Sequence, residues 1–153
     1  MQRGERGFIY AALLLALAVM AAGSATFASY WSHSIQRERE QELMRIGAEF
    51  VRAIAAYYEG STGTVKAYPP TLDALLEDAR YLQVRRHLRK IPRDPITLST
   101  DWGVVPAPDG GVMGVYSRSE QTPLRQAQFP AWVQVRGAPG RYLDMRFVYV
   151  PNS

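Results

Sequence analysis

The chain has 153 residues and a formal net charge of +4, which allows one domain with an added segment and does not by itself indicate a nucleic-acid partner. It contains no cysteine, which excludes a disulfide framework, a thiolate nucleophile, a cysteine-ligated zinc site and a lipoprotein anchor. Charge is unevenly distributed, because no Asp, Glu, Lys or Arg occurs from Gly7 to Gln36.

The first predicted element is an apolar helix. As a helix rising about 1.5 Å per residue, the run Phe8–Phe27 would cover the roughly 30 Å of a bilayer's hydrocarbon. We therefore predict a membrane-spanning helix over residues 8–31. Arg3 and Arg6 precede it, and positive charge on this side predicts a cytoplasmic N-terminus. The alternative is a secretory signal peptide that is removed after the small residues at 23–25.

An amphipathic continuation of the same helix is predicted next. From Leu43 to Tyr57 apolar residues recur at three- and four-residue spacing, with Arg, Glu and Gln between them. No proline occurs from Phe8 to Tyr58, and Gly60 is typical of a helix end. We expect one long helix whose second half, residues 32–59, lies against a domain.

The rest of the chain predicts short helical pieces followed by strands. Thr71 is a suitable N-cap for a helical excursion over residues 71–91, whose second piece runs from Tyr81 to Lys90. Apolar and polar residues then alternate in a way that indicates half-buried strands. These expected strands cover residues 102–105, 112–116, 131–136 and 143–150, with a hairpin turn at 108–111. We predict a small antiparallel sheet within 101–150 that packs on the apolar stripe of the long helix.

The order of several short motifs along the chain carries a family resemblance. The start Arg6-Gly7-Phe8, which is followed directly by an apolar helix, is similar to the prepilin-peptidase site of type IV pilins and type II secretion pseudopilins. Four later segments resemble, in the same order, the landmarks of major pseudopilins. They are Tyr68–Leu76, Arg93–Thr97, Asp101–Gly103 and Gly114–Ser117.

This resemblance implies a fold, a maturation step and a structural role. The fold would be α+β and pilin-like, with a long membrane-spanning helix packed on a small antiparallel sheet. A leader of residues 1–7 would be cut between Gly7 and Phe8 by the prepilin peptidase, and Phe8 would be methylated. The chain would be a single-pass protein of a bacterial inner membrane, with residues 32–153 in the periplasm. It would help to build a periplasmic filament for protein export and would not be an enzyme.

The expected partners follow from the same resemblance. They are other pilin-like subunits, inner-membrane assembly proteins, the prepilin peptidase and membrane lipid. The chain departs from the family at Ala12, where the family has a glutamate that is thought to pair with the amino terminus of a neighbouring subunit. Alanine cannot do this, which favours a minor or tip subunit. Two alternatives stay open: a non-polymerising single-span membrane protein with a periplasmic scaffold domain, and a DNA-binding minor pilin.

A basic cluster between Arg80 and Arg93 is the strongest candidate for an interaction surface. Its central members are Arg85, Arg86, Arg89 and Lys90. A solvated face or a docking surface for a neighbouring subunit is preferred to nucleic-acid binding, because Tyr81 is the only aromatic residue interleaved with the cations.

No catalytic or metal site is predicted, and no cofactor is expected. The two histidines, His33 and His87, have no recognisable catalytic neighbours in the sequence. Calcium is the one cofactor left open, because major pseudopilins hold calcium in a loop near the end of the sheet. The corresponding run, Ser117–Gln121, carries a single acid beside Arg118, which is a poor cage for a hard cation. Acids in or near turns, for which turn formation is the default role, are Asp94, Asp101, Asp109, Glu120 and Asp144.

Overall fold

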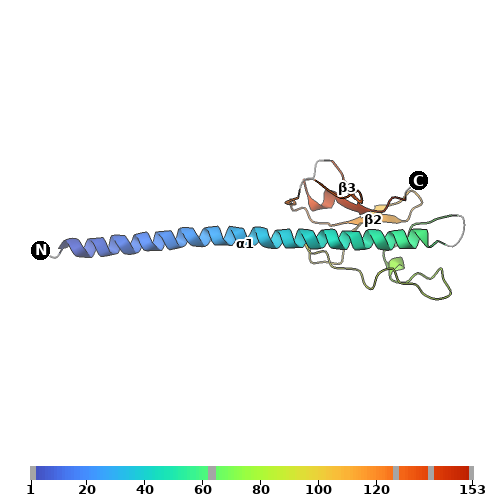
Figure 1. Ribbon diagram of the computed structural model, residues 1–153, viewed down its shortest axis with the longest axis horizontal. Helices are drawn as coiled ribbons and strands as arrows, with labels where there is room; N and C mark the ends of the chain where they lie inside the picture. The colour runs from blue at the N-terminus through green and yellow to red at the C-terminus, as the bar shows by residue number, and fades with distance from the viewer. Residues whose placement is uncertain (1–2, 62–64, 126–127, 138–139, 152–153) are drawn as a thin grey trace. The chain divides into compact units, whose positions relative to one another are not determined.

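A computed structural model describes residues 3–61, 65–125, 128–137 and 140–151, without the side chains of residues 3–8 and 21–33. It divides into two compact units, Met1–Glu38 and Arg39–Ser153. A long helix, α1, is followed by two 3-10 turns and four strands (Figure 1). The elements are α1 (Arg3–Glu59), η1 (Asp73–Leu75), β1 (Gly103–Pro106), β2 (Val112–Tyr116), β3 (Val133–Val135), η2 (Tyr142–Asp144) and β4 (Met145–Val148).

The first unit corrects the predicted membrane span. Within the part of the chain that the structure describes, no helix is both long enough and apolar enough to cross a membrane. This finding overturns the membrane-spanning helix over residues 8–31 and the pilin-like fold class built on it. It also overturns the single-pass location in an inner membrane with a cytoplasmic N-terminus and a periplasmic domain.

The second unit is organised around the apolar stripe of α1 that the residue spacing predicted. Five large side chains of this stripe are between 0 and 5 % exposed, and burial of each such side chain stabilises the fold by about 1.5–3 kcal/mol. They are Leu43, Ile46, Phe50, Ile54 and Tyr57. The core is therefore built from one helix face and whatever covers it.

A four-stranded antiparallel sheet covers one side of this stripe. The strand order is β1-β2-β4-β3, and Figure 1 shows the sheet on one side of the C-terminal part of α1, with η1 on the other side. Val115, Phe147 and Val133 lie opposite one another in register and are buried on the same face. Gly47 lets α1 approach this face closely, since a Cβ atom there would lie 2.6 Å from the Phe147 ring.

The hairpin between β1 and β2 forms where the turn residues predicted it. Asp109 Oδ1 accepts a hydrogen bond from Gly111 N at 2.9 Å, and Gly110 has a φ of +85°. Only glycine adopts this conformation without a steric cost. Asp109 Oδ2 also accepts from Tyr68 N at 2.9 Å, which ties the turn to the segment that follows α1.

The prediction of a helical excursion over residues 71–91 has to be corrected. Helical structure is limited to the single 3-10 turn η1, and the second piece expected from Tyr81 to Lys90 is wrong. The backbone forms an isolated antiparallel bridge between Asp78 and Arg85 instead. The backbone N–H groups of this segment donate across the loop and to η1 rather than along a helix, as the bonds from His87 N and Leu88 N to Leu75 O show.

Candidate functional site

The basic cluster lies on a loop that we call the basic loop, residues 79–90. Its base is closed by a hydrogen bond from Asp78 N to Arg85 O at 2.8 Å. On the return, the backbone N–H groups of His87 and Leu88 both donate to Leu75 O, at 2.8 and 2.9 Å. Leu88 is buried in the core. The loop is therefore held at both ends against η1 and the core, and its middle extends into solvent.

A buried carboxylate ties the basic loop to the last turn of α1. Asp78 has a side chain that is 0 % exposed, and Arg80 donates to it from Nε at 2.8 Å and from Nη2 at 2.7 Å. Arg80 Nη2 also donates to Tyr57 O at 2.8 Å, and Nη1 donates to Ser61 Oγ at 2.9 Å. His87 Nε2 lies 3.0 Å from Asp78 Oδ2. We call Asp78, Arg80 and His87 the anchor.

Electrostatics and aromatic packing reinforce the anchor. The Arg80 guanidinium lies 3.5 Å from the centre of the Tyr57 ring, which is a favourable cation–π arrangement. Hydrogen bonds from Arg80 hold the pKa of Asp78 well below its usual range, and those from His87 act in the same direction. The pKa of Arg80 is raised, chiefly by its bonds to Asp78. The charge of Arg80 is thus matched inside the loop's base, and its guanidinium is committed to the anchor.

The middle of the basic loop exposes apolar side chains together with cations. Leu82 is fully exposed, and Val84 is 57 % exposed. Tyr81 donates its hydroxyl hydrogen to Gly60 O, and the Arg85 guanidinium lies 4.2 Å from the centre of its ring. The loop therefore presents an aliphatic tip above a layer of aromatic and cationic groups.

The structure places all four predicted patch residues on the surface of this loop. Arg85, Arg86, Arg89 and Lys90 are exposed. Arg86 lies 3.9 Å from Glu77, but both side chains are more than two-thirds exposed, so this ion pair contributes little.

Two features of the loop were missed by the sequence reasoning. The anchor role of Asp78 depends on contacts with α1 that no local pattern reveals. The exposure of Leu82 and Val84 could have been found, because their alternation with polar neighbours is typical of an extended segment rather than of a helix.

The predicted processing site, Gly7 and Phe8, lies in the first unit. Gly7 and Phe8 lie within α1, and their side chains lie outside the described residues. Cleavage between them stays a prediction.

The acids considered for calcium lie apart and mostly serve local structure. Within the described ranges, no three or more His, Cys, Asp or Glu residues are grouped so that they could hold a metal ion. Buried Asp94 accepts from Ile96 N at 2.8 Å, Thr97 Oγ1 at 3.1 Å and Ser117 Oγ at 2.5 Å. Of the others, Asp101 pairs with Arg118 at 3.3 Å, Asp144 lies 3.9 Å from Arg141, Asp109 holds the hairpin turn, and Glu120 is exposed.

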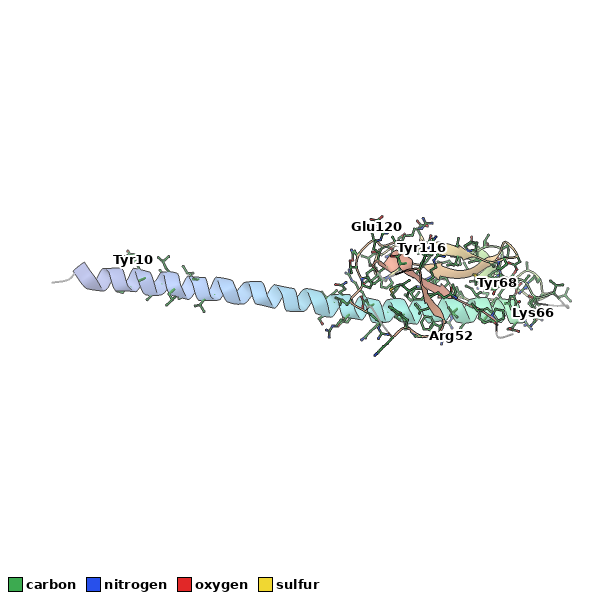
Figure 2. The ribbon with its side chains drawn as sticks, turned by 90° about the horizontal axis from the view of Figure 1, so that it is seen from above. Tyr10, Arg52, Lys66, Tyr68, Tyr116 and Glu120 are labelled. Carbon is green, nitrogen blue, oxygen red and sulfur yellow. The ribbon has the colours of Figure 1, made fainter. Side chains whose placement is uncertain are left out.

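A second polar cluster lies where α1 ends. The Glu59 carboxylate accepts from Tyr149 OH at 2.7 Å and from Lys66 Nζ at 2.8 Å, and Lys66 also donates to the backbone oxygen of Glu59. The hydrogen bond to Glu59, with burial, raises the pKa of Tyr149 to about 12. Figure 2 shows Lys66 and Tyr68 at this end of the second unit, with Tyr116 and Glu120 towards its other end. The cluster holds the C-terminal strand to the helix end.

Comparisons with known proteins add no relative. No protein-family model, no curated protein and no solved structure matches the chain significantly.

Proposed function

We propose that the chain is a structural, pilin-like subunit of a type II secretion or type IV pilus system. It joins other pilin-like subunits through the N-terminal part of α1 and so helps to assemble a filament for protein export. The proposal rests on the motif order that resembles pseudopilins and on the surface of the first unit. It assigns no catalytic role to the chain.

The observation that carries the proposal is the exposure of apolar side chains around α1. Seven large apolar residues in this stretch are between 55 and 68 % exposed. They are Ile9, Tyr10, Leu13, Leu14, Leu15, Leu17 and Val19. In Figure 2 the side chains near Tyr10 stand out from more than one side of the helix.

Their distribution favours packing among several helices. Leu13, Leu14 and Leu15 are consecutive and therefore point about 100° apart around a helix of 3.6 residues per turn. A pair of helices buries only one stripe on each partner, whereas a helix that is apolar all round is buried on all sides. Exposed apolar surface of this kind marks an interaction site. A bundle of like helices at the centre of a filament would cover it.

Cysteine cross-linking tests this arrangement, because the natural chain has no cysteine. Leu14→Cys places one thiol in the apolar part of α1, and Gln134→Cys places one on the exposed side of β3 as the matched control. In cells with the complete secretion or pilus system, Leu14→Cys should cross-link to other pilin-like subunits that carry a cysteine in their own N-terminal helices. Cross-links that are equally frequent from both positions, or absent from Leu14→Cys, would contradict the proposal.

A further inference from the structure

We propose that the basic loop docks on the surface of a lipid bilayer that contains anionic phospholipids. The tip, Leu82 and Val84, enters the boundary between headgroups and acyl chains, while the cations of the loop contact the phosphates. This is adsorption of a loop at a surface, and it stands independently of the filament role proposed above.

The apolar tip has the size of an interfacial anchor. Leu82 is fully exposed and Val84 is more than half exposed, although both are aliphatic. Two aliphatic side chains supply only a small part of the roughly 800 Å² that each partner contributes to a typical stable protein interface. They suffice to enter the first several ångströms of a bilayer, where apolar side chains add to electrostatic attraction.

The charged side chains of the loop itself are all cationic. Glu77, an exposed acid just outside the loop, lies 3.9 Å from Arg86 and offsets part of its charge. No Asp or Glu occurs from Ala79 to Arg93, and Arg85, Arg86, Arg89, Lys90 and Arg93 are all exposed. The buried Asp78 is matched by Arg80 and does not neutralise these groups. Near an anionic leaflet, each Lys or Arg strengthens binding by about five-fold.

The loop is already ordered in the shape that docking requires. The bridge between Asp78 and Arg85 closes its base, and the anchor holds that base to Tyr57. Tyr81 lies under the Arg85 guanidinium, and an aromatic ring with a polar end suits the headgroup region. Little conformational entropy would be lost on binding, since the tip is held out by the folded chain.

Nucleic acid fits this surface less well. Single-stranded nucleic acid binds where aromatic rings stack on bases beside a cationic groove, and Tyr81 is the single aromatic residue of the loop. Contact with phosphates alone gives Leu82 and Val84 no role.

Vesicle binding by the full chain tests the proposal. The measured quantity is the ratio of binding to vesicles of phosphatidylcholine with one-third phosphatidylglycerol over binding to phosphatidylcholine alone. This ratio removes any contribution of the apolar part of α1 that does not depend on headgroup charge. We expect the ratio to exceed ten at low salt and to fall as salt rises.

Two loop variants and one matched control separate the outcomes. Because each cation strengthens binding about five-fold, replacing Arg85, Arg86 and Arg89 by Gln should lower the ratio to near one. Replacing the exposed Arg52, Arg125 and Arg136 by Gln should leave most of it. Leu82→Ser with Val84→Ser should weaken binding to the anionic vesicles without any change in charge. An equal loss in the control triple would overturn the proposal.

A fluorescent label reports insertion directly. An environment-sensitive dye on Leu82→Cys should brighten with anionic vesicles, and the same dye on the exposed control Glu120→Cys should not. If the dye at position 82 stays unchanged, the proposal is wrong. If the arginine triple weakens binding to single-stranded DNA while the Leu82/Val84 variant leaves vesicle binding intact, the loop is a nucleic-acid surface instead.

Discussion

Loss of the Asp78 carboxylate is expected to detach the base of the basic loop from α1 and so to destabilise the fold. Arg80 donates two hydrogen bonds to this carboxylate, at 2.7 and 2.8 Å, and His87 Nε2 lies 3.0 Å from it. Asp78→Ala removes the partner of both side chains. Removing one partner of a buried charge pair costs about 3–5 kcal/mol. The Arg80 side chain is 26 % exposed, so water can replace part of its lost contact. We therefore expect the lower end, about 3 kcal/mol of unfolding free energy.

Urea unfolding followed by tryptophan fluorescence measures this cost. Glu77→Ala is the matched control, because it removes a neighbouring carboxylate whose 3.9 Å pair with Arg86 is exposed, and it should change the unfolding free energy by less than about 0.5 kcal/mol. A double-mutant cycle of Asp78→Ala with Arg80→Ala should show a coupling energy well above 1 kcal/mol. If Asp78→Ala costs no more than Glu77→Ala, the anchor does not hold the loop.

The same carboxylate predicts a pH dependence. Because the pKa of Asp78 is lower in the folded chain than its ordinary value of 3.8, its contribution to stability is present above pH 3.8 and is lost as the pH falls through the folded value. Asp78→Asn should flatten the fall in unfolding free energy below about pH 4. A wild-type and a variant curve of the same slope would refute this assignment.

Three further changes test the packing and the end of α1. Gly47→Ala would set a Cβ atom 2.6 Å from the Phe147 ring and should cost about 1–3 kcal/mol in urea unfolding; a neutral result would mean that α1 can move away from the sheet. Phe50→Ala removes a fully buried ring and should cost about 3–5 kcal/mol in the same assay, and a loss below 1 kcal/mol would contradict the core described. Since the pKa of Tyr149 is raised from 10.0 to about 12, its stabilising effect is present below pH 10 and is lost between pH 10 and 12. Tyr149→Phe should remove that part of the loss in a pH series of thermal midpoints, and an unchanged profile would contradict the bond to Glu59.

Local patterns predicted the parts of the fold whose causes are local. The stripe that includes Leu43 and Phe50 repeats at helical spacing, and the residues Asp109 and Gly110 can form a tight turn by themselves. The helix predicted from Tyr81 to Lys90 is wrong because the structure of this segment depends on tertiary contacts. Its residues tolerate a helix, but the burial of Asp78 against the end of α1 favours an extended loop.

The sequence indicated which residue types could form the candidate surface, but not how the loop arranges them. Arg85 and Arg86 stand out in the sequence as a cluster of charge, and the structure leaves both exposed. The sequence does not reveal which arginine of the cluster is bound in the anchor. Arg80 is set apart from Arg85 and Arg86 by its contacts with Asp78 and Tyr57 in the folded chain. The predicted membrane span is wrong, because no helix of the described residues is both long enough and apolar enough to cross a membrane.

The N-terminal mass of the protein isolated from cells with and without the prepilin peptidase gene tests the proposed function most directly. A filament subunit of the proposed kind should begin at Phe8, with the mass of a methyl group added, only when the peptidase is present. A chain that begins at Met1 in both strains would contradict assembly through this pathway.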